Sequence, residues 1–392
     1  MKVSILGQGY VGLPLAIAAA EAGHQVVGID TSEELVKQLN SAQSPIMDIS
    51  NDQLTHALKS TNYSATTEFQ VVRDSEIVII CVPTPLDTSR KPDLAPLRSA
   101  LEAIAKNLNP NSLIINESTV SPGTTRGLIK ETLDKAGVLY ELAYSPERID
   151  PANKRWTVTN TPKLVAGLSP AATQRAVEFY KTFVDSVTVG SSPEVIETAK
   201  LLENSFRLVN ISFVNEIAQF CEAMGIDVRE VIDAAATKPY GFMPFYPGAG
   251  VGGHCIPVDP SYLVSKAQEL GVPTRFIDLA NDQNRSLATY FTGVATGILG
   301  ELTSKKIVVV GVAYKPDVAD IRETPAEGLI KELRIKGADV KWHDDLIQEW
   351  NGEKSVPLSA DFDLAILVNP HSNTDLDALG STRVLNTRGG YK

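Results

Sequence analysis

Apolar and amphipathic segments alternate along the first half of the chain. Short apolar runs, each about as long as a buried strand, occupy residues 2–6, 25–29, 76–82, 112–116, 140–144 and 163–167. Segments with the helical spacing of apolar residues lie between them, at residues 13–22, 32–43, 93–108 and 124–137. Strands that alternate with helices predict a doubly wound parallel sheet with helices on both faces.

The pattern becomes helical after residue 192. Residues 193–224 have a continuous helical pattern, in which Pro193 suits a first turn and Gly225 suits a helix end. Further helices are predicted at residues 227–237, 262–271 and 276–299. Since no strand pattern interrupts them, we predict an all-helical central region that contains one long helix.

Strands and helices alternate again from Lys305 onward. The pattern predicts strands at residues 306–312, 339–343, 362–368 and 383–385, and a helix at residues 324–336. The fold class is therefore α/β, with a helical region between two α/β domains of unequal size. The predicted domains span residues 1–192, 193–301 and 302–392.

The turn after the first predicted strand has the sequence GQGYVG, and the second strand ends at Asp30. In this context Gly7 permits a tight turn, Gly9 lets the backbone approach a pyrophosphate, and Gly12 lets the helix pack closely on the strand. The Asp30 carboxylate would bind ribose hydroxyls and repel a 2′-phosphate. The sequence therefore predicts a Rossmann-type domain that binds NAD rather than NADP. The alternative is a βαβ unit without a ligand.

Three further loops follow predicted strands of this sheet. They are rich in proline or hydroxyl residues and contain Thr84, Thr119 and Glu147. Ligands of doubly wound sheets bind beyond the carboxyl ends of the strands, so we expect Thr119 and Glu147 near the cofactor. Cys81 lies inside an apolar strand and is predicted to be a packed core thiol.

A loop rich in glycine and proline occupies residues 242–263, with the sequence GVGGHCIPVDP at its centre. Glycine and proline are too dense here for a helix or an ordinary strand. Glycine also lets the backbone come close to a ligand, so we expect these glycines to admit a substrate beside Cys255. Asp259 follows four residues later. The alternative is a glycine-rich turn around a buried, inert cysteine.

Two pairs of polar residues are further candidates for the site. Lys200 and Asn204 share one face of the long helix, where a lysine facing a cleft could stabilise an oxyanion; the alternative is a solvated lysine. Lys315 and Arg322 follow the first strand of the C-terminal domain, where two cations suit phosphate groups. The alternative for this second pair is an ordinary charged surface.

Composition narrows the classes of partner and compartment. The 392 residues carry a net charge of −11 and have a sequence pI of about 5.1, which argues against nucleic-acid binding and anionic membrane surfaces. No apolar stretch predicts a transmembrane helix, and no signal peptide is predicted. Three cysteines suit a reducing cytoplasm, and five scattered histidines predict no metal site.

Together these motifs resemble one family over essentially the whole chain: the UDP-glucose/UDP-mannuronate-type nucleotide-sugar 6-dehydrogenases. GQGYVGLPLA, the Lys200–Asn204 pair, GVGGHCIPVDP and GVAYKPDVADIRETPA occur in the order and spacing of that family. His254 before the cysteine makes the chain most similar to the branch that acts on UDP-N-acetylhexosamines, especially UDP-N-acetylglucosamine. In place of a second glutamate found in UDP-glucose enzymes, this chain has Pro151.

The resemblance implies a four-electron oxidation of the C6 alcohol of a UDP-sugar by NAD, in polysaccharide biosynthesis. It implies catalytic roles for Cys255, Lys200, Asn204, Asp259, Glu147 and Thr119. It implies cofactor contacts from Gly7, Gly9, Tyr10, Val11, Gly12, Asp30, Thr84, Thr119 and Arg322. It implies substrate contacts from Glu147, Lys200, Asn204, Tyr246, Gly250 and Lys315, and a homodimer or higher homo-oligomer.

Two other functions are compatible with parts of the pattern. A β-hydroxyacid or phosphogluconate-type dehydrogenase also combines a dinucleotide domain, a long helix and a Lys-x-x-x-Asn pair. Such an enzyme needs neither Cys255 nor residues 302–392. A non-catalytic protein that senses NAD or a nucleotide sugar would be expected to lack Cys255, Lys200 or Asp259, and all three are present.

Overall fold

The computed structural model describes residues 1–60, 62–150, 153 and 155–389. It forms two compact units, one of Met1–Leu202 with Ser261–Leu270 and one of Glu203–Pro260 with Gly271–Lys392. The chain passes from one unit to the other inside helix α7 (Pro193–Met224) and inside helix α9 (Asp259–Glu269). The bounds of the three predicted domains stay a prediction.

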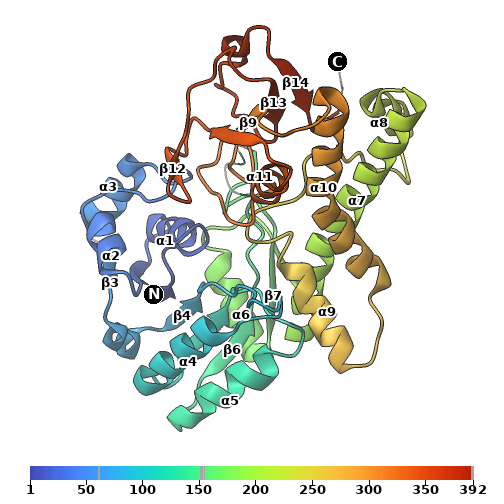
Figure 1. Cartoon of the computed structure of the whole chain (residues 1–392). Helices are drawn as coiled ribbons and strands as arrows, with labels where there is room; N and C mark the ends of the chain where they lie inside the picture. The colour runs from blue at the N-terminus through green and yellow to red at the C-terminus, as the bar shows by residue number, and fades with distance from the viewer. Residues whose placement is uncertain (61, 151–152, 154, 390–392) are drawn as a thin grey trace. The chain divides into compact units, whose positions relative to one another are not determined.

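An eight-stranded sheet forms the centre of the first unit, in the order β3-β2-β1-β4-β5-β6-β7-β8 (Figure 1). The strands are β1 Lys2–Leu6, β2 Gln25–Ile29, β3 Tyr63–Thr66, β4 Ile77–Ile80, β5 Leu113–Asn116, β6 Glu141–Tyr144, β7 Lys163–Gly167 and β8 Val187–Val189. Neighbours from β3 to β6 are parallel, which confirms the doubly wound arrangement. The all-parallel prediction is wrong for β7, which runs antiparallel to β6, with β8 parallel to β7.

Helices cover this sheet on both faces because successive strand residues point to opposite sides. Ile79 packs in a cluster with α1 (Gly12–Glu21), α3 (Asn51–Lys59) and α6 (Pro170–Tyr180). The adjacent Ile80 packs in another cluster with α4 (Ala95–Asn107). The remaining helical segments are α2 Glu33–Asn40, η1 Phe69–Asp74, η2 Thr125–Ile129, α5 Lys130–Leu133 and η3 Asp134–Ala136.

The helical part of the second unit is built on α7, α8 (Val228–Ala236) and α10 (Arg275–Leu299). Helices α7 and α10 lie side by side (Figure 1), joined by a hydrogen bond of 2.9 Å from the Ser212 hydroxyl to the Ala280 carbonyl. The elements described between residues 193 and 301 are all helices, as predicted. Helix α9 begins three residues before the predicted start, which places Asp259 in its first turn.

A smaller parallel sheet forms the C-terminal part of the second unit, in the order β10-β9-β13-β14. Its strands are β9 Lys306–Val310, β10 Asp339–His343, β13 Leu364–Leu367 and β14 Arg383–Asn386. Helices α11 (Pro325–Ile335) and α10 bury apolar side chains against it. A hairpin of β11 (Glu349–Trp350) and β12 (Glu353–Lys354), and η4 (Leu376–Leu379), complete this part.

Whether a helix can cross a membrane depends on its length and on how apolar it is. Within the described part of the chain, no helix combines the length and the apolar character that crossing a bilayer requires.

Candidate active site

The turn after β1 has the geometry of a pyrophosphate-binding loop. Gly7 has a φ of +86°, and a Cβ there would lie 2.5 Å from the carbonyl oxygen of Cys81. A Cβ on Gly12 would lie 1.8 Å from the carbonyl oxygen of Gly7, so only glycine lets α1 start this close to β1. A Cβ on Gly9 would meet nothing within 4 Å. The backbone at Gly9 is therefore open to a ligand, next to Tyr10 and Val11.

Asp30 lies at the end of β2, beside this turn. One carboxylate oxygen accepts a hydrogen bond of 2.9 Å from the backbone N–H of Gln8, and the other accepts one of 3.0 Å from Ser32. The amide side chain of Gln8 is buried and accepts a bond of 2.9 Å from the Tyr63 hydroxyl. These bonds fix Asp30 while its side chain stays partly exposed, as ribose recognition requires.

The loops that carry Thr84 and Thr119 are joined through Tyr262 of α9. The Tyr262 hydroxyl donates to the Thr84 carbonyl at 3.0 Å, and the Ser121 hydroxyl donates to the Tyr262 carbonyl at 3.1 Å. Buried Glu197 of α7 accepts from the backbone N–H groups of Gly123 and Thr125, at 2.6 and 2.9 Å. The segment that follows Thr119 is therefore fixed by Tyr262 and Glu197.

Glu147 belongs to a buried network of charges. Its carboxylate accepts from the ammonium of Lys163 at 2.9 Å and from the backbone N–H groups of Arg148 and Ile149 at 2.6 and 2.7 Å. Burial alone would raise the pKa of Glu147, but Lys163 and these N–H groups outweigh burial and hold the pKa below its usual value. Glu147 is therefore an ionised, fixed group. Pro151 lies outside the described residues.

Helix α7 carries both members of the predicted Lys-x-x-x-Asn pair, one turn apart. Lys200 is only 7% exposed, so the alternative of a solvated lysine is wrong. The Asn204 side-chain amide donates a hydrogen bond of 2.6 Å to the Asp259 carboxylate. Asp259 itself is 2% exposed, so the structure brings two of the predicted catalytic residues together.

Cys255 stands just before the first turn of α9. Its carbonyl accepts hydrogen bonds from the backbone N–H of Val258 at 3.2 Å and of Asp259 at 2.8 Å, so the turn is already helical. The side chain of Cys255 is exposed, in contrast to Cys221, which is buried. Negative charge is favoured at the start of a helix, which suits a thiolate nucleophile.

The glycines of the thiol loop (residues 248–255) serve a purpose that the sequence did not predict. Added Cβ atoms would lie 2.6 Å from the Glu323 carbonyl oxygen at Gly252, and 2.7 Å from the Tyr314 ring at Gly253. The N–H of Gly253 donates to the Arg322 carbonyl at 2.9 Å. We expected these glycines to admit a substrate, but these two let the thiol loop pack against residues 314–325.

The loop after β9 carries the predicted phosphate ligands. Arg322 forms an ion pair with Asp320, with a shortest distance of 2.6 Å, yet the arginine side chain remains 46% exposed. Lys315 is partly exposed on the same loop. Burial, with the charge of Arg322, lowers the pKa of His254, so the imidazole beside Cys255 is neutral at physiological pH.

Tyr246 and Gly250 lie at the two ends of one segment of the second unit. The Tyr246 hydroxyl donates to Asp233 of α8 at 3.0 Å, and the guanidinium of Arg229 lies 5.8 Å from its ring centre. Gly250 has a φ of +130°, and a Cβ there would lie 3.0 Å from the side-chain oxygen of Asn284. Both residues therefore have fixed surroundings.

Comparison with known proteins supplies the observation that decides the family. Sequence models of the UDP-glucose/GDP-mannose dehydrogenase family match the chain three times. They match as its NAD binding domain over residues 1–184, its central domain over residues 194–286 and its UDP binding domain over residues 308–377. The chain belongs to the UDP-glucose/GDP-mannose dehydrogenase family. It is an NAD-dependent UDP-sugar dehydrogenase.

Individual relatives agree with this assignment. The chain is 35% identical to Protein CapL of Staphylococcus aureus, over 88% of this chain and 82% of that protein. It is 33% identical to UDP-N-acetyl-D-glucosamine 6-dehydrogenase of Pseudomonas aeruginosa, over 89% and 83%. The solved structure of UDP-D-ManNAc dehydrogenase from Pyrococcus horikoshii superposes with a TM-score of 0.90 at 30% identity, covering 99% of this chain and 95% of that one.

Several residues of this dehydrogenase's candidate site escaped the sequence analysis. Lys163, Glu117 and Glu197 are charged residues inside apolar segments, and that placement was the available signal. Arg388 lies after β14, where its guanidinium donates to the Asn369 side chain at 2.7 Å and its carbonyl accepts from Arg229 at 3.0 Å.

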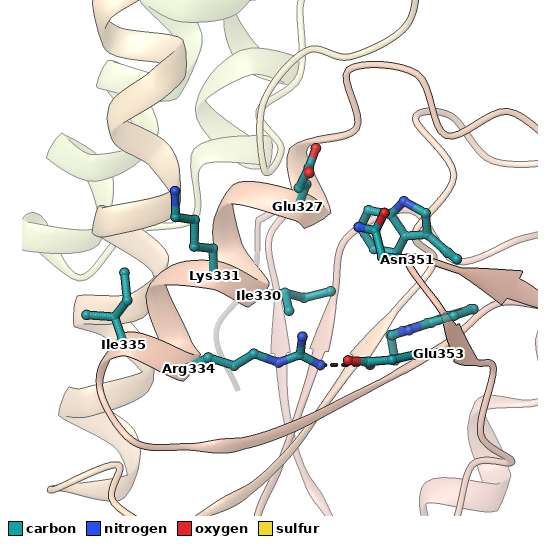
Figure 2. Close-up of a pocket in the computed structure, with 9 residues that line it drawn as sticks. Glu327, Ile330, Lys331, Arg334, Ile335, Asn351 and Glu353 are labelled. Atoms are coloured by element: carbon teal, nitrogen blue, oxygen red, sulfur yellow. Dashed lines mark hydrogen bonds and ion pairs between the residues drawn. The ribbon is translucent and has the colours of Figure 1, made fainter.

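A surface pocket of about 450 Å³ lies on the C-terminal part of the second unit (Figure 2). Helix α11 and the β11–β12 hairpin form its walls, and the ion pair of Arg334 with Glu353, 2.8 Å apart, crosses one side. None of the residues predicted for the site lines this pocket. Within the described ranges, no cluster of His, Cys, Asp or Glu is suited to a metal ion.

Proposed function

We propose that this dehydrogenase oxidises the C6 alcohol of a UDP-N-acetylhexosamine to the carboxylate, with NAD as the hydride acceptor. Per sugar, one alcohol, two NAD⁺ and one water give one carboxylate, two NADH and three protons. The observation that carries the proposal is an exposed Cys255 just before the first turn of α9. There Asp259 is hydrogen-bonded to Asn204 at 2.6 Å.

Cys255 supplies covalent catalysis in this proposal. The first oxidation gives an aldehyde, whose carbonyl carbon is attacked by the thiolate to form a carbon–sulfur bond. Loss of a second hydride from this thiohemiacetal gives a thioester. Water then breaks the carbon–sulfur bond, which releases the carboxylate and restores the thiol.

The neighbouring polar residues stabilise charge and orient water. Lys200 and Asn204 bear donor groups suited to the oxyanion that develops at C6. Asp259, held by Asn204, is placed to position water and accept a proton. Thr119 and Glu147 are the remaining polar residues that we propose for the reaction at C6. Because the pKa of Glu147 is lowered, this carboxylate is better suited to binding and orienting than to accepting protons.

The remaining predicted residues bind the two nucleotides. In the proposal NAD is contacted by Gly7, Gly9, Tyr10, Val11, Gly12, Asp30, Thr84, Thr119 and Arg322. The UDP-sugar is contacted by Tyr246, Gly250 and Lys315, together with Glu147, Lys200 and Asn204. The open backbone at Gly9 and the partly exposed Asp30 support the first assignment. The partly exposed Lys315 of the 314–325 loop supports the second.

UDP-N-acetylglucosamine is the first candidate substrate, because the His254–Cys255 sequence resembles that branch. UDP-N-acetylmannosamine, which differs only in configuration at C2, is the second. Relatives of both names match the chain at similar identity, 33% to the P. aeruginosa glucosamine enzyme and 35% to a Methanococcus maripaludis mannosamine enzyme. NADH release across a panel of UDP-glucose and UDP-N-acetylhexosamines separates these substrates.

The catalytic proposal is tested with Cys255→Ser and with the ratio of NADH formed to sugar consumed. We expect about two NADH per sugar for the wild type and no acid product for Cys255→Ser, which still binds NAD. Cys221→Ala is the matched control, because that cysteine is buried in an apolar cluster with Val228 and Ile232 of α8, and it should keep turnover within about twofold. A ratio of one, or full turnover by Cys255→Ser, would contradict the covalent mechanism.

We also propose that the enzyme is a cytoplasmic homodimer whose subunits meet along α7. Phe206, Phe213 and Phe220 recur at heptad spacing on this helix and are 47%, 59% and 60% exposed. Three exposed phenylalanines on one stripe form a surface that a second copy would cover. Sedimentation analysis that found only monomer at micromolar concentration would refute this assembly.

A further inference from the structure

The reversed strand β7 places a lysine where a parallel strand could not. In the parallel part of the sheet, β5 and β6 end at one edge, where Glu117 follows β5 and Glu147 lies in the loop after β6. Because β7 runs antiparallel to β6, its first residue, Lys163, lies at that same edge. Topology therefore brings one buried cation between two carboxylates.

The contacts of Lys163 stabilise its positive charge in the protein interior. Its ammonium lies 2.8 Å from the Glu117 carboxylate and 2.9 Å from that of Glu147, and the residue is only 4% exposed. The same ammonium lies 5.2 Å from the centre of the Tyr180 ring, and the Tyr180 hydroxyl donates to Glu117. The Lys163 ammonium is thus held from one side by Glu117 and directed to Glu147 on the other.

The pKa values of the two carboxyl groups, Glu117 and Glu147, are shifted in opposite directions. Burial raises the pKa of Glu117 to about 7, although Lys163 opposes the shift, while the pKa of Glu147 is held low. Glu147 also accepts from two backbone N–H groups, whereas Glu117 accepts from the Lys163 ammonium and the Tyr180 hydroxyl. The neighbouring titratable groups, Tyr180 and Cys81, have pKa values raised by burial and stay neutral. Lys163 is therefore the cation that stabilises Glu147.

We propose that Lys163 is a positioning residue, which, anchored on Glu117, keeps the Glu147 carboxylate ionised and oriented for the reaction. The inference rests on the proposed function, because Glu147 affects turnover only if it acts beside the C6 carbon. Lys163 does not touch the substrate in this proposal. Its removal therefore changes the rate through the state of Glu147.

The test compares Lys163→Met and Lys163→Arg with the wild type, using NADH release from UDP-N-acetylglucosamine over a range of pH. We expect Lys163→Met to lower kcat about 100-fold with NAD affinity within about threefold, because the residues proposed to bind NAD are retained. The acidic limb of the kcat profile should move to higher pH, because an unpaired, buried Glu147 ionises later. Lys163→Arg should recover kcat to within about tenfold, because it retains the charge.

Lys130→Met is the matched control. It removes the same charge from a surface ion pair with Asp134, 2.6 Å long, in the same unit. We expect kcat within about twofold of the wild type, because exposed pairs contribute little. A loss as large as that of Lys163→Met would mean that removal of any lysine charge has this effect, which would overturn the inference.

Misfolding of Lys163→Met is addressed by the double variant Lys163→Met/Glu117→Gln, which removes one buried carboxylate together with the ammonium. A folded double variant with low kcat and the displaced acidic limb supports the proposal. A folded double variant with wild-type kcat, or an acidic limb that does not move, overturns it. Turnover by the wild type and inactivity of Cys255→Ser in the same assay establish the proposed function separately, so either negative result applies to Lys163 alone.

Discussion

The first turn of the N-terminal sheet and that of the C-terminal sheet share one design. The N–H of Gly7 donates to the last residue of β2, and the N–H of Gly311 donates to the last residue of β10, both at 2.8 Å. Each turn is followed by an N–H that donates to an aspartate after the second strand. Gln8 donates to Asp30 at 2.9 Å, and Val312 donates to Asp344 at 2.8 Å.

The two turns differ in how exposed the aspartate is and in how many hydrogen bonds it accepts. Asp30 accepts from Gln8 and Ser32 and stays partly exposed, and α1 begins directly at Gly12. Asp344 is 2% exposed and accepts from His371 and from the backbone of Val312, Ala313, Leu346 and Ile347. Helix α11 begins only at Pro325, after the long loop that carries Lys315 and Arg322. The same scaffold thus leaves its acid partly exposed beside a helix start in one sheet and uses its acid to fix a cationic loop in the other.

The largest expected effect separates the two aspartates. Asp344→Ala should lower the free energy of unfolding by about 3–5 kcal/mol, because it leaves several buried N–H groups without an acceptor. Asp30→Ala should lower it by only about 1 kcal/mol and mainly weaken NAD binding. Urea unfolding and NAD titration of both variants measure this difference. Equal losses of stability would remove the contrast between the two turns.

A second pair of variants compares Gly311 of the C-terminal turn with Gly9 of the N-terminal turn. A Cβ at Gly311 would lie 2.1 Å from the backbone carbonyl of Asn369, at a φ of +80°, so Gly311→Ala should cost about 3 kcal/mol of stability. Gly9→Ala meets open space, so it should leave the urea midpoint unchanged and weaken NAD binding about tenfold. Thermal unfolding and NAD titration distinguish the two. Unchanged NAD affinity in Gly9→Ala would contradict the assignment of the cofactor loop.

The smallest expected effect is on the dependence of folding stability on pH. The folded protein raises the pKa of Glu117 from 4.5 to about 7, so its stabilising contribution is present below pH 4.5 and is lost as the pH rises through about 7. The pKa of Asp344 is lowered, chiefly by His371 and backbone N–H groups against the effect of burial. Its contribution is therefore present above pH 3.8 and is lost on further acidification. Of these two carboxyl groups, only Glu117 changes its contribution to stability between pH 5 and 8, by on the order of 2 kcal/mol.

Glu117→Gln should therefore flatten the dependence of the urea midpoint on pH between 5 and 8. Asp344→Asn should instead remove the part of the dependence that comes from His371, because the Asp344 carboxylate helps to raise the pKa of that imidazole against the effect of burial. The two variants serve as each other's controls, because each replaces a buried carboxyl by its amide. An unaltered slope in Glu117→Gln would show that this carboxyl is ionised well below pH 7.

The local features of the fold were predictable because their signals are local. The predicted bounds of the long helix, 193–224, agree with α7, since proline and glycine mark its two ends. Strands β3 and β8 were not predicted because their sequences, YSAT and VTV, are short and largely polar or exposed. The reversal of β7 is a matter of strand pairing, which hydrophobic pattern does not encode.

The site was predictable to the extent that its chemistry lies in motifs. The hydrogen bond between Asn204 and Asp259 joins two residues that the sequence analysis had already named as catalytic candidates. The catalytic roles of these two residues remain proposals. Lys163 was not predicted, since its partners lie 46 and 16 residues away along the chain. The packing of Gly252 and Gly253 depends on Tyr314 and the residues after it, which no local pattern connects to the thiol loop.

The contact between the thiol loop and residues 314–325 has a consequence for enzyme engineering. A chimaera that takes residues 302–392 from a relative would bring a foreign Tyr314 and Glu323 beneath the native Gly252 and Gly253, where the spacing leaves no room for a Cβ. The exchangeable module is therefore larger than the C-terminal sheet. Recombination that keeps residues 248–255 and 314–325 from one parent should preserve the nucleophile, whereas a crossover between them should inactivate it.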